Sequence, residues 1–184
     1  MTVSRFALAA ATVALTVSFA VAQDTQDAPS IEVEPRMTID RLAEIALAVD
    51  PEAEVSPSRI QLTVADLPVL VVMDPAADRM RAFVPIRSSE TMSEEELMRV
   101  MQANFDTALD ARYAVANGRL WAVFIHPLGP LERDQFLSAL GQTVNLALSY
   151  GTLYSGGAMS FGNGDSGALQ RQLIEDLLNK GQDI

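Results

Sequence analysis

Residues 113–125 contain the feature that most restricts the fold, two apolar segments joined by Asn117-Gly118. A two-residue hairpin turn needs a positive φ at both central positions, and Asn-Gly meets this need best. The turn pairs Val115 with Leu120 and Ala114 with Trp121, which fixes the register of the two strands. The chain is therefore expected to build an antiparallel sheet around this hairpin.

Both faces of the predicted hairpin are apolar, because successive side chains of a strand point to opposite faces. One face carries Tyr113, Val115, Leu120, Ala122 and Phe124, and the other carries Ala114, Trp121, Val123 and Ile125. An uncovered apolar patch is unusual on a soluble monomer, so the second face needs cover. Helices of the same chain, a second subunit or a partner segment could supply it, and the sequence leaves these alternatives open.

Strands and a helix are predicted upstream of the hairpin. Thr38 is a good N-cap for a helix that Pro51 stops. Alternation predicts strands at 60–64 and 79–87. The run 69–73 is continuously apolar, which predicts a strand covered on both faces.

Two further helices are predicted before the C-terminal one. Ser93 and Glu96 form a capping box at the start of one helix. Its predicted apolar face comprises Leu97, Val100, Met101, Asn104, Phe105 and Ala108. Another helix is expected to begin near Gly129-Pro130 and to end at Gly151.

These elements predict an α+β fold with a single antiparallel sheet of about five strands packed by helices. The expected order is α-β-β-β-α-β-β-α, followed by a C-terminal helix. The expected divisions are a signal peptide at 1–22, an acidic linker at 23–36, an α/β domain at 37–150, a Gly/Ser-rich connector at 151–167 and an amphipathic helix at 168–184.

The first residues are typical of a bacterial export signal. Arg5 precedes an uncharged run from Phe6 to Phe19, and Ala20-Val21-Ala22 then supplies the small-x-small pattern for cleavage before Gln23. We therefore expect a periplasmic or secreted protein that has no membrane attachment after cleavage. An uncut membrane anchor is the alternative reading of the same segment.

Composition excludes several classes of chemistry. The net charge of −11 argues against binding nucleic acid or an anionic membrane, because both require clustered positive charge. The absence of cysteine excludes disulfides and thiolate catalysis. Gly164-Asp165-Ser166-Gly167 resembles a serine-protease motif, but the only histidine, His126, follows a predicted strand, and Asp165 or Ser166 would more simply cap the last helix. We predict no catalytic residue, cofactor or metal site, and expect His126 to contact local backbone rather than to act as a base or pH switch.

The order of elements resembles the YbjN family and, more distantly, class I type III secretion chaperones of the CesT type. The resemblance spans about residues 37–150 and depends on the Val69–Met73 strand, the helix from Ser93 to Leu109 and the hairpin that ends in His126-Pro127. It implies a single antiparallel sheet packed by helices, often in a dimer, with no known catalytic residues. In the secretion chaperones, apolar sheet and helix surfaces hold an extended partner chain, but those chaperones lack export signals.

The sequence thus predicts an exported, YbjN-like binding or regulatory module for a protein or peptide partner, with a homodimer as one form of that partnership. The expected contact residues are Trp121, Val123 and Ile125, with Met98 and Met101 as secondary candidates because methionine adapts to varied apolar partners. Two alternatives stay open. One is a small periplasmic hydrolase, which would need two carboxylates facing one cleft, and the other is a structural envelope-stress protein without a ligand.

Overall fold

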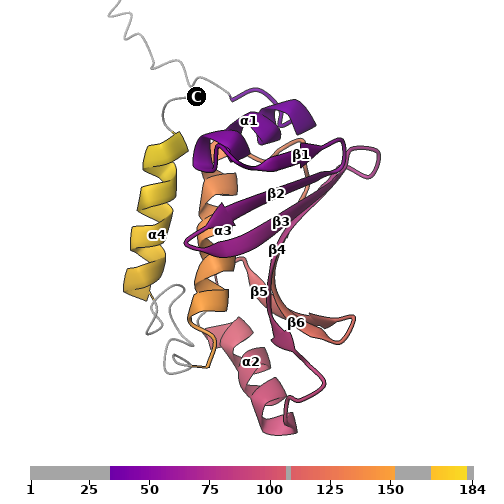
Figure 1. Ribbon diagram of the computed structural model, residues 1–184, viewed down its shortest axis with the longest axis vertical. Coiled ribbons are helices and arrows are strands. Elements are labelled where there is room, and N and C mark those ends of the chain that lie inside the picture. The colour runs from indigo at the N-terminus through magenta and orange to yellow at the C-terminus, as the bar shows by residue number, and fades with distance from the viewer. Residues whose placement is uncertain (1–33, 107–108, 152–166, 182–184) are drawn as a thin grey trace, which may run out of the picture. The chain divides into compact units, whose positions relative to one another are not determined.

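The computed structural model describes residues 34–106, 109–151 and 167–181. Within them it contains four helices and one six-stranded antiparallel sheet in the order β1-β2-β3-β4-β6-β5 (Figure 1). The elements are α1 (Ile39–Val49), β1 (Glu54–Ser56), β2 (Arg59–Val64), β3 (Leu67–Asp74), β4 (Arg79–Ser88), α2 (Glu94–Asp106), β5 (Arg112–Ala116), β6 (Arg119–His126), α3 (Arg133–Leu148) and α4 (Gly167–Lys180). The predicted α+β class is confirmed, with β1 as an additional short strand. The predicted signal peptide and most of the linker and connector lie outside the described residues.

The hairpin of β5 and β6 has the predicted register. Val115 lies opposite Leu120 and Ala114 lies opposite Trp121. Asn117 and Gly118 adopt φ values of 51° and 68°, as this type of turn requires. The local turn chemistry therefore determines which hairpin side chains face the core.

The core lies between one face of the sheet and the helices. Alternate residues of the strands are buried there, namely Ile60, Leu62, Val64, Val69, Val71, Met73, Met80, Ala82, Val84, Tyr113, Leu120, Ala122 and Phe124. Buried residues of α1, α2 and α3 belong to the same cluster. All three helices therefore pack on the same face of the sheet.

Helix α3 runs through the middle of this layer and is buried nearly all round. It begins at Arg133, later than Gly129-Pro130, because Leu128–Leu131 forms a turn in which the Leu131 N–H donates to the Leu128 carbonyl. Its buried residues include Gln142, Thr143 and Asn145 as well as apolar side chains. Burial on every side means that α3 has a second neighbour besides the sheet.

That neighbour is α4. Gly141 of α3 allows the close approach, since a Cβ at this position would lie 2.7 Å from Cγ1 of Ile174. The buried Asn145 side chain donates to Oε1 of Gln170 at 3.1 Å, and Leu177 is 2 % exposed. In Figure 1, α4 lies on the outer side of α3, away from the sheet. The C-terminal helix is thus a third layer and does not cover the helix-free face of the sheet.

Helix α2 begins as predicted but presents a different face to the core. The Ser93 N–H donates to Oε2 of Glu96, and the Glu96 N–H donates to Oγ of Ser93, which is the reciprocal capping box. Val100 of the predicted apolar face is buried, but Met101 and Phe105 of that face are 62 % and 73 % exposed, and Ala103, which lies outside it, is buried. The main contact of the helix with the sheet is along β5, so it buries a narrow stripe.

The capping box predicts a pH effect on α2. Hydrogen bonding from the Ser93 backbone N–H, with the nearby Arg87 guanidinium, lowers the pKa of Glu96 from its ordinary value of 4.5. The ionised group thus stabilises the fold above that value, and this contribution is lost as the pH falls through the lowered pKa. We expect amide-exchange protection of α2 to fall between about pH 6 and about pH 3 in the wild type. The fall should be smaller in Glu96→Gln than in the control Glu94→Gln, and an equal fall in both would contradict this role for Glu96.

Candidate partner-binding surface

The face of the sheet opposite the helices is called the open face here. It is formed by the alternate residues Arg59, Gln61, Thr63, Leu70, Val72, Arg81, Phe83, Ala114, Trp121, Val123 and Ile125, with their neighbours toward the strand ends. Each of these residues is exposed or half-buried, and none is buried. No helix of the described residues packs on this face (Figure 1).

An apolar strip crosses the middle of the open face. Leu70 lies opposite Phe83, and Phe83 lies opposite Val123, so these three side chains form one row across β3, β4 and β6. The neighbouring positions add Val72, Trp121 and Ile125, which completes the apolar strip. Val72 is 37 % exposed and Ile125 is 55 % exposed. The prediction that the 69–73 strand is covered on both faces is therefore wrong for the described part of the chain.

Trp121 is held in a fixed position within the strip. Its ring lies edge-on to Phe83, with ring centroids 5.4 Å apart and an angle of 83° between the ring planes. Its indole N–H donates to the Ala116 carbonyl at 3.0 Å, and the Arg119 guanidinium lies 5.8 Å from the ring centroid. These contacts leave the indole half-buried and preorganised, which lowers the entropy lost when a partner binds.

A shallow hollow of about 470 Å³ indents the open face beside the strip. Val72, Phe83 and Ile125 supply its apolar lining, and Asp74, Arg79 and Arg81 surround them. Concave apolar surfaces with a few polar groups are typical of binding sites. The hollow therefore offers a place for apolar side chains of a partner.

The predicted contact residues are divided between two surfaces. Trp121, Val123 and Ile125 share the open face, as the period-two pattern indicated. Met98 and Met101 are 65 % and 62 % exposed, but they line a separate hollow of about 480 Å³ on α2.

The sequence reasoning missed the other half of the strip, contributed by Leu70, Val72 and Phe83. Alternation in 79–87 places Phe83 opposite the core-facing residues and could have indicated it. Placing Phe83 next to Trp121 also needed the knowledge that β4 lies beside β6.

A polar hollow of about 710 Å³ lies between β6 and α3 and contains the only histidine. Asp110 and Asp134 both line it, together with His126. Nδ1 of His126 lies 2.8 Å from the Pro127 carbonyl oxygen, which is the local backbone contact expected from the sequence. Both carboxylates are exposed, and Asp134 pairs with Arg133 at 3.0 Å. In the described residues, no group of three or more acidic or histidine side chains could hold a metal ion.

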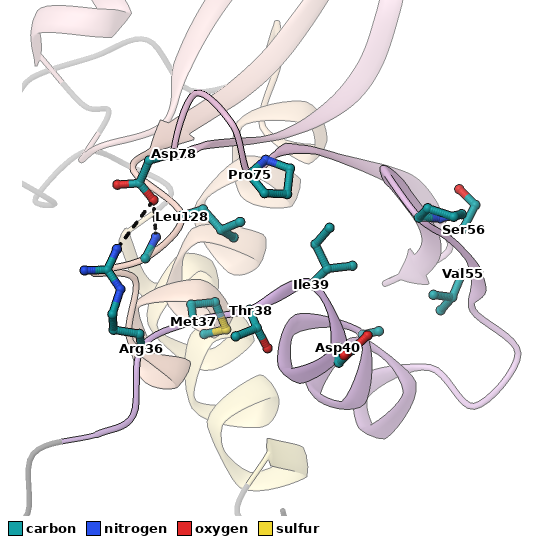
Figure 2. A pocket seen from close by; sticks show the side chains of 13 residues that line it. Arg36, Met37, Thr38, Ile39, Asp40, Val55, Ser56, Pro75, Asp78 and Leu128 are labelled. Atoms are coloured by element: carbon teal, nitrogen blue, oxygen red, sulfur yellow. Dashed lines mark hydrogen bonds and ion pairs between the residues drawn. The ribbon is translucent and has the colours of Figure 1, made fainter.

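A further hollow of about 700 Å³ lies beside the start of α1 and the turn between β3 and β4 (Figure 2). Asp78 stands at its edge with a φ of 50°, and its Oδ1 accepts a 2.7 Å hydrogen bond from the Gly129 N–H. Arg36 lies 4.0 Å from the same carboxylate, and the Met37 N–H donates to the Gly129 carbonyl. These contacts join three segments distant in sequence, so Asp78 has a structural role here.

No protein-family model and no curated protein matches the chain. The resemblance to the YbjN family therefore stays a prediction. None of the helices formed by the described residues is both long and apolar enough to span a membrane.

Proposed function

We propose that this protein is an exported, YbjN-like binding module that holds a protein or peptide partner on the open face of its sheet. The observation that carries the proposal is the apolar strip on a face that no helix of the described residues covers. Apolar side chains gathered on an exposed face mark an interaction site. The rigid setting of Trp121 against Phe83 adds a preformed anchor of the kind that dominates binding energies.

The position of α4 supports this proposal over a sealed structural protein. A tethered C-terminal helix was one of the candidates to cover the Trp121 face. It instead packs on α3 through Gly141 and Leu177, on the opposite side of the sheet. Since no described helix covers this face, we propose a separate partner chain as its cover, and a second copy of the chain is one such partner.

Among the described residues, two hollows are each lined by two carboxylates, which the hydrolase alternative needs: Asp110 and Asp134 in the polar hollow, and Asp40 and Asp78 in the hollow beside α1. A carboxylic general acid needs shielding from water, which keeps it protonated near neutral pH. None of these four carboxylates is buried, which favours the binding proposal.

Trp121 provides a direct test of binding, because it is the only tryptophan and lies on the open face. The test uses a neutral peptide of about ten residues in which leucine alternates with glutamine. An extended peptide of this length spans the sheet, so its binding should change the fluorescence of Trp121. The change Ile125→Asp should weaken this binding about tenfold, because it places a charge in the apolar strip. Light scattering of the same variant measures any self-association.

Leu47→Asp is the matched control, because Leu47 is 41 % exposed on α1, on the other side of the sheet. It should bind the peptide as the wild type does. Equal binding by the wild type and Ile125→Asp, with unchanged light scattering, would contradict the proposed role of the open face.

A further inference from the structure

The open face is rich in arginine although the chain as a whole carries a net charge of −11. Five arginines project from the strands on this face, namely Arg59, Arg79, Arg81, Arg112 and Arg119. The same strand faces carry two carboxylates, Glu54 and Asp74. The overall composition therefore hides a locally positive surface.

Ion pairing separates these five arginines from nearly all the others. Five described arginines away from the open face each pair with a carboxylate, namely Arg36, Arg41, Arg87, Arg99 and Arg133. None of the five on the open face forms an ion pair with a carboxylate of a described residue, and the same holds for Arg171 on α4. Arg112 also lines the polar hollow, and its guanidinium donates to the Leu109 and Ala111 carbonyls, so the other four are the arginines most available to a partner. In a chain with almost twice as many acidic as basic residues, arginines left unpaired together on one face indicate complementarity to something outside the chain.

The arginines and the apolar strip interleave. Arg59 and Arg81 lie on either side of Val72 in one cross-strand row, and Ile125 continues that row beyond Arg81. Arg79 and Arg81 also edge the hollow that Val72 and Ile125 line. A partner that matches this surface must carry negative charges and apolar groups in close alternation.

We infer that the partner presents an extended acidic segment whose sheet-facing side chains, at every second residue, are in turn apolar and carboxylate. This inference rests on the proposed function and adds the chemistry of its partner. Strands about 4.8 Å apart and an extended chain rising about 3.3 Å per residue mean that about eight residues cross the six-stranded sheet. On the side of the segment that faces the sheet, apolar side chains enter the strip and the hollow, and carboxylates meet the guanidinium groups.

Single-stranded nucleic acid is the other polymer that an aromatic and basic sheet face suits, but it fits less well. Its bases stack on flat aromatic faces. Here the Arg119 guanidinium lies over the Trp121 ring, and Phe83 stands edge-on to it. A polyanion would also meet stronger repulsion from the rest of this acidic chain than a short acidic segment with few charges does.

The test compares three peptides of about ten residues built on the repeat Leu-Thr-X-Thr, in which X is glutamate, glutamine or lysine. Leucine and X then share one face of the extended peptide, and binding is followed by Trp121 fluorescence. We expect the glutamate peptide to bind at least about tenfold more tightly than the lysine peptide, and its affinity to fall as salt rises from about 0.05 M to about 0.5 M. The triple variant Arg59→Gln, Arg79→Gln and Arg81→Gln should lose about tenfold in affinity for the glutamate peptide.

A second triple variant, Arg99→Gln, Arg133→Gln and Arg171→Gln, removes the same charge from other surfaces and should bind within about twofold of the wild type. Equal affinity for the glutamate and lysine peptides, or equal loss in the two triple variants, would overturn the acidic partner and leave the proposed function standing. An oligothymidylate that binds more tightly than the glutamate peptide would overturn it in favour of nucleic acid. If no peptide changes Trp121 fluorescence, the proposed function itself fails.

Discussion

Leu177→Asp is expected to lower the free energy of unfolding by about 4 kcal/mol, because it places a carboxylate where α4 meets the core. Leu177 is 2 % exposed and belongs to the core cluster. Undocking of α4 would also expose the buried pair of Asn145 and Gln170 on the facing helix surfaces. Urea unfolding followed by Trp121 fluorescence measures the loss.

The same helix offers a matched control for this prediction. Leu169→Asp makes the identical change at a position that is 42 % exposed, and should cost less than about 1 kcal/mol. Similar losses in the two variants would show that α4 contributes little to the stability of the domain. The contrast therefore measures how strongly the third layer is attached.

Asp78→Val should destabilise the protein by about 3 kcal/mol, from two separable causes. A β-branched residue is strained at the φ of 50° that Asp78 adopts. Valine also removes the acceptor for the buried Gly129 N–H, which lies 2.7 Å from Oδ1. Thermal unfolding followed by circular dichroism gives the total effect.

Two further substitutions divide this effect between its causes. Asp78→Asn keeps both the acceptor and the tolerance of positive φ, and should cost less than about 1 kcal/mol, because Arg36 is highly exposed and its ion pair contributes little. Asp78→Gly keeps only the conformational freedom, and should cost about 1–2 kcal/mol. A glycine variant as stable as wild type would show that the hydrogen bond to Gly129 contributes nothing.

Local signals in the sequence predicted the local structure well. Asn117-Gly118 determined both the hairpin and its register, and Thr38 and Ser93 marked true helix starts. The turn between β2 and β3 escaped prediction because Ala65 and Asp66 adopt positive φ without a glycine or asparagine to signal it. Strand β1 has only three residues, too few to show a period.

Features that depend on long-range packing were not predictable from the sequence. The apolar residues of α2 fit more than one stripe, and only contact with β5 selects Val100 and Ala103 for burial. For the candidate site, alternation placed Trp121, Val123 and Ile125 on one face. Predicting their neighbours on β3 and β4 would have needed the strand order of the sheet. That order is not local information, because β4 pairs with β6 although α2 and β5 lie between them in the sequence.

The two outermost strands, β1 and β5, are the shortest of the six, with three and five residues. Short edge strands expose few unpaired backbone N–H and C=O groups, so they are poor templates on which another chain could extend the sheet. Fibril-like growth through these edge strands is therefore disfavoured, even though the apolar strip lies exposed between them. Binding of a partner as an added strand at either edge of the sheet is disfavoured for the same reason. The partner of this sheet is therefore selected by side-chain chemistry.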